Sequence, residues 1–564
     1  MRKLCSITSA IVLVMATAVL AWGDSKTPAP AQSAGQQENN SVAEKIFYRE
    51  AKLVEDMHKF SPLVETYIQN LKPKADGDMD PTSDAYFLGR LVLNEKGLGD
   101  KPYTSRSAGL SGTVSERLTA FYRMNYLPLG FMQLVFLNDN FDAQHYDLKF
   151  VRQQFLGEVR TLVFDVVAKP HFKGPHFVGR IWAEDQDYNI VRINGSYEPR
   201  SRLVFYFHFD TWRVNMQPGL WLPAYVYTEE TDTRYMLVRK LSMKGQTRLW
   251  GYKLTLPNRE DELTAIQVDP TQVSDQSDQA ANEFNPIQSE RMWEHQAEDN
   301  LIERMERAGV LAPEGDVSKV LQTVVNNLEI TNGLNITPPV RCRVLLTTPF
   351  ETFTIGHTII VSRGLLDVLP NEAALASVLA HELAHITLGH RVDTRYAFSN
   401  RLLFPDEQVF RRIAIGRNQQ QENDADQKAL EFLAKSPYKD KLADAGLFLA
   451  ALQQHAEELK WLITPHFGNP LANKSEVVRM AGLMKGNEKL DNDSITQISA
   501  LPLGSRVKLD PWDDHLELKK TVAVPLLSAR EKMPFEVTPL FPHLVRFNGM
   551  PQVAKTAEST AAPK

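Results

Sequence analysis

The sequence predicts an α+β protein, in which an N-terminal antiparallel β-sheet or half-barrel precedes a mainly helical domain. Apolar and polar residues alternate with a period of two through residues 146–245, which is typical of strands with one buried face. After residue 285 the apolar residues recur mostly at helical spacing. The chain has 564 residues, more than one ordinary domain, and a hydrophobic content of 43%, which is that of globular proteins.

The first residues, 1–22, predict a secretory signal peptide. Arg2 and Lys3 precede an apolar run that ends at Leu20, and small residues with Ala21 follow as a cleavage signal. The alternative is an uncleaved signal anchor, which the shortness of the apolar run disfavours. We therefore expect an exported protein, periplasmic or secreted, with no transmembrane span after signal cleavage.

Composition divides the remaining chain. Pro, Ala, Gln and Ser dominate residues 23–44, which predicts a disordered tether. A helical pattern follows from about Val42 to Leu71. The predicted segments are a β-rich domain at 45–267, a polar linker at 268–285, the helical domain at 286–500, a C-terminal extension without assigned role at 501–550 and a disordered tail at 551–564. Within 286–500 we expect helices at about 286–309, 315–331, 371–390, 418–435 and 439–460, with one β-rich stretch at 341–366.

Charge and cysteine usage exclude some functions. The formal net charge of -6 gives no indication of nucleic-acid binding. Cys5 lies in the signal, so Cys342 is the thiol that remains, and neither an intramolecular disulfide nor a cysteine zinc cluster is expected. Cys342 is expected to be a small buried strand residue.

The stretch VLAHELAHITLGHR, residues 378–391, contains the strongest chemical signal. His381 and His385 are four residues apart, so in a helix both imidazoles face the same way and suit one zinc ion. Glu382 lies beside them, where it can take a proton from a zinc-bound water. The alternative is a pair of core histidines with hydrogen-bond partners. His390 is expected on the opposite side of the helix, as a residue near its C-terminus.

A third metal ligand is expected further along the chain. The stretch NQQQENDADQKALEFLA begins at Asn418 and offers Glu422 and Asp426, which share a helix face. One carboxylate could bind the metal while the other orients a ligand histidine. The alternative interpretation of these acids is a solvated helix start.

At these residues the sequence resembles the HtpX-like zinc metallopeptidases, peptidase family forty-eight, through VSRGLLDVLPNEAALASVLAHELAHITLGHR and ENDAD. The resemblance covers about residues 287–490 and implies a gluzincin metallopeptidase domain with one Zn²⁺ per chain. It implies His381, His385 and Glu422 as metal ligands, Glu382 as the catalytic base and Asp426 beside the metal. Two segments depart from the family pattern. Glu351, Thr352 and Phe353 stand where the family has Asn-Ala-Phe, and ITPHFGNPLANKSEVVRM is only similar to its Thr-His-Pro segment, with His466 as a candidate extra contact or a plain loop histidine.

The β-rich part resembles the lipoprotein-carrier (LolA-like) half-barrel through FVGRIWAEDQDYNIVRINGSY and GLWLPAYVYTEE. This resemblance implies a concave apolar surface for a lipid chain, a lipoprotein or an extended peptide, although a structural sheet packed on the other domain is the alternative. Together the two resemblances imply an exported zinc endopeptidase that acts on protein or peptide substrates, in quality control of envelope proteins. The alternative is a lipid-binding or chaperone-like protein with a structural or nearly inactive metal site.

Overall fold

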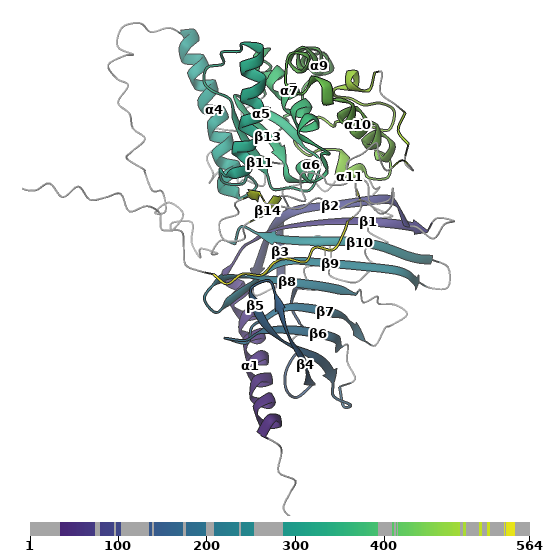
Figure 1. The fold of residues 1–564 in the computed structure, drawn as a ribbon. Helices are drawn as coiled ribbons and strands as arrows, with labels where there is room; N and C mark the ends of the chain where they lie inside the picture. Colours follow the sequence, from purple (N-terminus) through teal and green to yellow (C-terminus); the bar gives the residue numbers. More distant parts are fainter. Residues whose placement is uncertain are drawn as a thin grey trace, which may run out of the picture.

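The computed structural model describes residues 34–73, 79–94, 97–102, 135–137, 140–172, 176–198, 208–235, 239–252, 286–392, 409–410, 413, 415–485, 489–491, 494, 507–509, 516–518, 535 and 537–547. The predicted α+β class is confirmed: a large antiparallel sheet precedes a helix-rich region (Figure 1). The segments expected as signal peptide, interdomain linker and disordered tail lie outside the described residues, and so do Phe205 and Phe207 of the predicted strand series.

The N-terminal sheet has ten strands in the order β3-β2-β1-β10-β9-β8-β7-β6-β5-β4. From β4 to β10 each strand pairs with the next one along the chain, and β1 then pairs antiparallel with β10, so that Leu63 lies opposite Trp250. The strands are β1 (Leu63–Pro73), β2 (Met79–Asn94), β3 (Gly97–Pro102), β4 (Tyr146–Leu156), β5 (Val159–Ala168), β6 (His176–Glu184), β7 (Ile190–Glu198), β8 (Phe209–Gln217), β9 (Leu220–Tyr235) and β10 (Arg239–Trp250).

Residues on both faces of this sheet are buried, because each face packs against another part of the chain. One face packs with α1 (Ala34–Asp56), whose Ile46 and Phe47 join Phe164 and Phe177 in one cluster. The other face carries tryptophans and tyrosines that are continuous with the core of the helical region. These aromatic residues are Trp182, Trp212, Trp221, Tyr225, Tyr227 and Trp250.

The helix expected from Val42 to Leu71 is only partly right. α1 begins at Ala34, inside the segment expected to be a disordered tether, and ends at Asp56; after the short helix η1 (Met57–Lys59) the chain enters β1. β1 pairs with β2 on one side and β10 on the other. Because pairing on both sides rewards the β-branched and aromatic residues of this stretch, tertiary context overrides its helical spacing.

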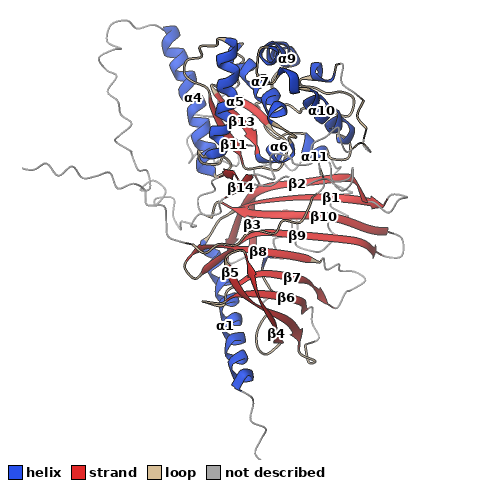
Figure 2. Ribbon diagram, in the orientation of Figure 1, coloured by secondary structure: helices blue, strands red, loops and turns tan. Residues whose placement is uncertain are grey.

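The helix-rich region begins with α4 (Pro286–Ala308) and α5 (Asp316–Asn332), which flank a three-stranded sheet (Figure 2). In that sheet β13 (Thr358–Ser362) lies between a parallel β11 (Arg341–Leu345) and an antiparallel β12 (Thr352–Ile355). The further elements are α6 (Arg363–Val368), α7 (Glu372–Thr387), α9 (Gln419–Ala434), η4 (Lys439–Lys441), α10 (Ala443–His455), α11 (Lys460–Ile463), η5 (Ala481–Met484), β14 (Val507–Leu509) and β15 (Leu516–Leu518). The helix expected at 439–460 is thus divided among η4, α10 and the start of α11. Among the described residues no helix combines the length and apolar character needed to cross a bilayer.

Two buried carboxylates of the large sheet connect it to the helix-rich region. Glu65 of β1 accepts hydrogen bonds from the backbone N–H and the hydroxyl of Thr348, at 2.6 and 2.8 Å, and pairs with Arg248. Asp84 of β2 accepts the N–H groups of Trp461 and Leu462 at 2.9 and 2.8 Å. Burial raises the pKa of Asp84 to about 6. The sheet therefore caps the first turn of α11 and fixes the segment that leads into β12.

Residues 537–547 run across one face of the sheet (Figure 1), and their contacts with Trp212 and Tyr225 place them on the aromatic face. At one end, Gln69 of β1 donates to the carbonyl of Phe535 at 2.6 Å. At the other, the backbone N–H of Glu158, in the turn between β4 and β5, donates to the carbonyl of Leu544 at 2.9 Å. In between, Phe541 lies against Arg192 and Trp212. This part of the predicted C-terminal extension is therefore a cover for the sheet.

Candidate metal centre

The candidate centre is built on α7, whose start and end follow from the sequence. The Asn371 side chain accepts the N–H of Ala374 at 2.9 Å and caps the first turn. The helix is buried from Ala373 to His385, so its polar residues need partners inside the protein. It ends at Thr387, and Gly389 then takes φ +69°, a left-handed conformation that reverses the chain.

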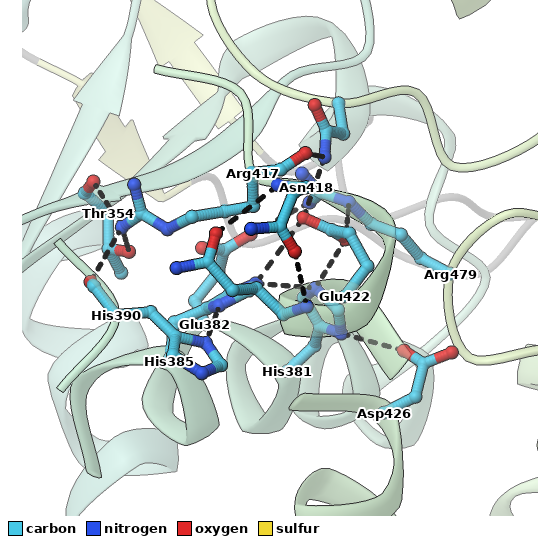
Figure 3. A network of polar contacts seen from close by, with 12 residues as sticks. Thr354, His381, Glu382, His385, His390, Arg417, Asn418, Glu422, Asp426 and Arg479 are labelled. Atoms are coloured by element: carbon cyan, nitrogen blue, oxygen red, sulfur yellow. Dashed lines mark hydrogen bonds and ion pairs between the residues drawn. The ribbon is translucent and has the colours of Figure 1, made fainter. Parts of the chain in front are cut away.

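The structure brings His381, His385 and Glu422 together (Figure 3). The Nε2 atoms of His381 and His385 are 3.1 Å apart, and the Glu422 carboxylate oxygens lie 3.2 Å from the first and 3.5 Å from the second. Ligands at about 2.0–2.1 Å from a tetrahedral zinc ion are about 3.3 Å from one another. The donor set and its spacing therefore fit one zinc ion.

Glu422 reaches the histidines because α9 packs against α7. Asn418 caps α9 in a reciprocal pair with Gln421, which puts Glu422 in the first helical turn. Asn469 donates to Glu422 Oε1 at 2.8 Å and fixes the carboxylate. Burial raises the pKa of Glu422, but hydrogen bonds from both histidines hold it well below its usual range. The carboxylate is thus ionised, as a metal ligand must be.

Asp426 lies one turn further along α9 and contacts His381 from behind. Its Oδ1 is 2.8 Å from His381 Nδ1, while the backbone N–H of Met480 donates to the same carboxylate at 2.8 Å. Burial lowers the pKa of His381, but the contacts to Asp426 and Glu422 outweigh this effect and raise it. A carboxylate on the far ring nitrogen directs the Nε2 lone pair of His381 toward the metal position.

Glu382 is buried beside the triad and has two donors. Arg479 Nη1 donates to Glu382 Oε1 at 2.8 Å, and the hydroxyl of Thr352 on β12 donates to the same oxygen at 3.1 Å. Arg479 Nε also lies 3.0 Å from Glu422 Oε2. One guanidinium therefore contacts two buried carboxylates and offsets part of their negative charge.

His390 does not lie where its position in a continuous helix would put it. Its Nδ1 is 2.9 Å from His385 Nδ1, whereas the sequence predicted the opposite side of the helix. The reason is that α7 ends three residues earlier and the turn at Gly389 folds the chain back. Arg417 donates to the carbonyl of His390 at 3.0 Å and holds this turn against the site.

His466 contacts other residues than the triad in the described structure. Its backbone N–H donates to Glu351 at 2.7 Å, and its ring Nε2 is 3.3 Å from the carbonyl of Phe410. Glu351 is itself buried, and burial raises its pKa to about 8. The structure thus gives His466 a backbone role next to β12, and metal contact by its ring stays a prediction.

Sequence reasoning missed three polar residues of the site: Arg479, Thr352 and Asn469. Thr352 was noted only as a departure from a family pattern, and the other two lie in the segment that was only similar to Thr-His-Pro. One signal was available, since Arg479 stands among apolar residues in VVRM and a buried arginine requires acidic partners.

The site has two imidazoles and a carboxylate around one position, and a further glutamate, Glu382, on the helix that carries both histidines. This arrangement defines a metallohydrolase type of site. Residues 321–404 match the family model described as Peptidase family M48, which indicates a zinc-dependent metallopeptidase. This match covers α7 but ends before Glu422 and Arg479. No curated protein matches the chain.

The solved structures that match the chain distantly include the following two. A LolA superfamily protein from Nitrosomonas europaea is 13% identical, with 39% of this chain and 96% of that chain covered and a TM-score of 0.18. The MucA/MucB complex of Pseudomonas aeruginosa is 10% identical, with 39% and 96% covered and a TM-score of 0.13.

Proposed function

We propose that the chain is an exported zinc endopeptidase that cleaves unfolded or misassembled envelope proteins. The observation that supports the chemistry is the convergence of His381, His385 and Glu422 to within 4.8 Å, with Glu382 on the same helix. The M48 match supports peptide-bond hydrolysis as the reaction. Export rests on the predicted signal peptide, and the choice of envelope substrates rests on the family resemblance alone.

His381, His385 and Glu422 are the residues that would hold zinc, which supplies Lewis-acid polarisation of a carbonyl and a lowered pKa for a bound water. Glu382 would act as the general base toward the attacking water and as the acid toward the leaving amine. Arg479 and Thr352 both contact Oε1 of Glu382, which leaves Oε2 as the oxygen that handles the proton. Asp426 orients His381 throughout.

The test compares the wild-type chain with Glu382→Gln. Zinc content is measured together with cleavage of an unfolded, fluorescently labelled protein. We expect the variant to retain its zinc and to lose at least about 10²–10⁴-fold in rate, the usual contribution of a general base. Asp424→Asn is the matched control, because Asp424 lies on α9 near the site without contacting the triad in the described structure. Unchanged cleavage in Glu382→Gln contradicts the proposal and favours the lipid-binding or chaperone-like alternative.

A further inference from the structure

A second group of metal-binding side chains lies apart from the triad, between α4 and the turn that joins β12 to β13. His295 and Glu298 are three residues apart on α4, and His357 is in the turn. One ligand atom from each of the three lies within 4.8 Å of the others. His295 Nδ1 is 3.2 Å from Glu298 Oε2, and the ring centroids of His295 and His357 are 5.4 Å apart. All three side chains are partly buried.

The turn is shaped to receive the Glu298 carboxylate. Ile355 pairs with Thr358, so Gly356 and His357 form a two-residue hairpin turn, and Gly356 has φ +55°. A Cβ on Gly356 would overlap the Glu298 carboxylate, with Oε2 as its nearest neighbour. The missing side chain is therefore what lets Glu298 come up beside His357.

We propose that His295, Glu298 and His357 bind a second divalent transition-metal ion, of which zinc is the representative. Two imidazole nitrogens and one carboxylate oxygen are a donor set that zinc accepts, and the partial exposure leaves room for a water as fourth ligand. This site does not depend on the proposed peptidase function, because it shares no residue with the triad.

Charge around the cluster favours a cation. In the described part of the chain, no Lys or Arg forms an ion pair with Glu298. Its hydrogen-bond partner is His295, and the charge of Arg417 acts on it only weakly. The neighbouring Asp299 is already paired with Arg341, at 2.6 Å. An added divalent ion would supply the positive charge that the Glu298 carboxylate lacks.

An ion at this position would tie the β12 turn to α4. β12 contributes Thr352, which donates to Glu382, and Thr354, whose hydroxyl accepts from Arg417 at 3.2 Å. The second ion would therefore hold the strand that lines the triad, without entering the chemistry.

The number of zinc ions per chain tests the proposal. It is measured by elemental analysis after the full chain has been equilibrated with a zinc buffer. We expect two ions in the wild type and one in His295→Ala and His357→Ala. His381→Ala should also bind one ion, and the double variant His357→Ala/His381→Ala none. His58→Ala, an exposed histidine on η1, is the control and should bind two.

Gly356→Ala is the sharper variant, because it changes no ligand. Its Cβ displaces the Glu298 carboxylate, so we expect one zinc ion, with the triad still loaded as proof of folding. One ion fewer in His357→Ala than in the His58→Ala control supports the site. Equal zinc in His357→Ala and the wild type, or one ion in the wild type and none in His381→Ala, overturns it. Because the second site is counted in the His381→Ala background, its absence is distinguishable from failure of the triad.

Discussion

Replacing Asp84 by asparagine tests how the large sheet is joined to the region that carries the triad. Asp84 Oδ1 accepts the N–H of Trp461, and Oδ2 accepts the N–H of Leu462 and the hydroxyl of Tyr67. The carboxyl is 8% exposed, and burial raises its pKa from 3.8 to about 6. Asparagine keeps one acceptor oxygen and removes the titration.

Proton binding by Asp84 determines how its contribution to the free energy of unfolding changes with pH. Between pH 3.8 and about 6 the folded chain holds a proton on Asp84 that the unfolded chain has lost. The contribution of Asp84 is therefore most favourable at low pH and is lost as the pH rises through about 6. A difference of about two pKa units, at about 1.4 kcal/mol each, corresponds to about 3 kcal/mol.

We expect the free energy of unfolding of Asp84→Asn, relative to wild type, to rise by about 2.4 kcal/mol between pH 4 and pH 7, because the rest of the difference develops below pH 4. Urea unfolding followed by tryptophan fluorescence at intervals across this range measures it, and subtraction of the wild type removes the pH dependence of other groups. The lost second acceptor adds an offset that does not change with pH. Asp440→Asn, the same change at an exposed aspartate, is the control. A difference between Asp84→Asn and wild type that stays constant with pH refutes the reasoning.

Three further perturbations have defined outcomes. Asp426→Ala should weaken zinc binding by about 10–100-fold in competition with a chromophoric chelator, because His381 loses its orienting acceptor; unchanged affinity contradicts this. Arg479→Met should destabilise the zinc-free chain by about 3–5 kcal/mol in urea unfolding, since Glu382 and Glu422 lose their common cation, and a loss below about 1 kcal/mol would show that the pairings contribute little. Gly364→Ala should cost about 1–3 kcal/mol or more and lower the melting temperature, because its Cβ would overlap the carbonyl of Thr348; an unchanged melting temperature contradicts the tight packing.

The sequence was most informative where local spacing and chemistry agree. The spacing of His381 and His385 places both on one helical face, and Glu422 and Asp426 are one turn apart on another helix, so each pair could be recognised without tertiary information. The way the two helices meet depends on packing between α7 and α9, which no local pattern encodes.

The residues that sequence reasoning missed are set by long-range contacts. Arg479 reaches Glu382 across 97 positions, and Thr352 reaches it across 30. His390 was misplaced because the end of α7 and the Gly389 turn, rather than helical rotation, decide its position. β1 was taken for helix because its partners β2 and β10 come later in the chain.

Residues 537–547 limit the access of any amphiphile to the aromatic face of the sheet. Two aromatic side chains of the sheet already contact this stretch. Phe541 packs against Trp212, and the hydroxyl of Tyr225 donates to the carbonyl of Thr538. A fatty acyl chain that binds the same aromatic side chains must first displace this segment. Deleting residues 537–547 would expose these aromatic side chains, so lipid binding to the sheet should increase in the deletion variant.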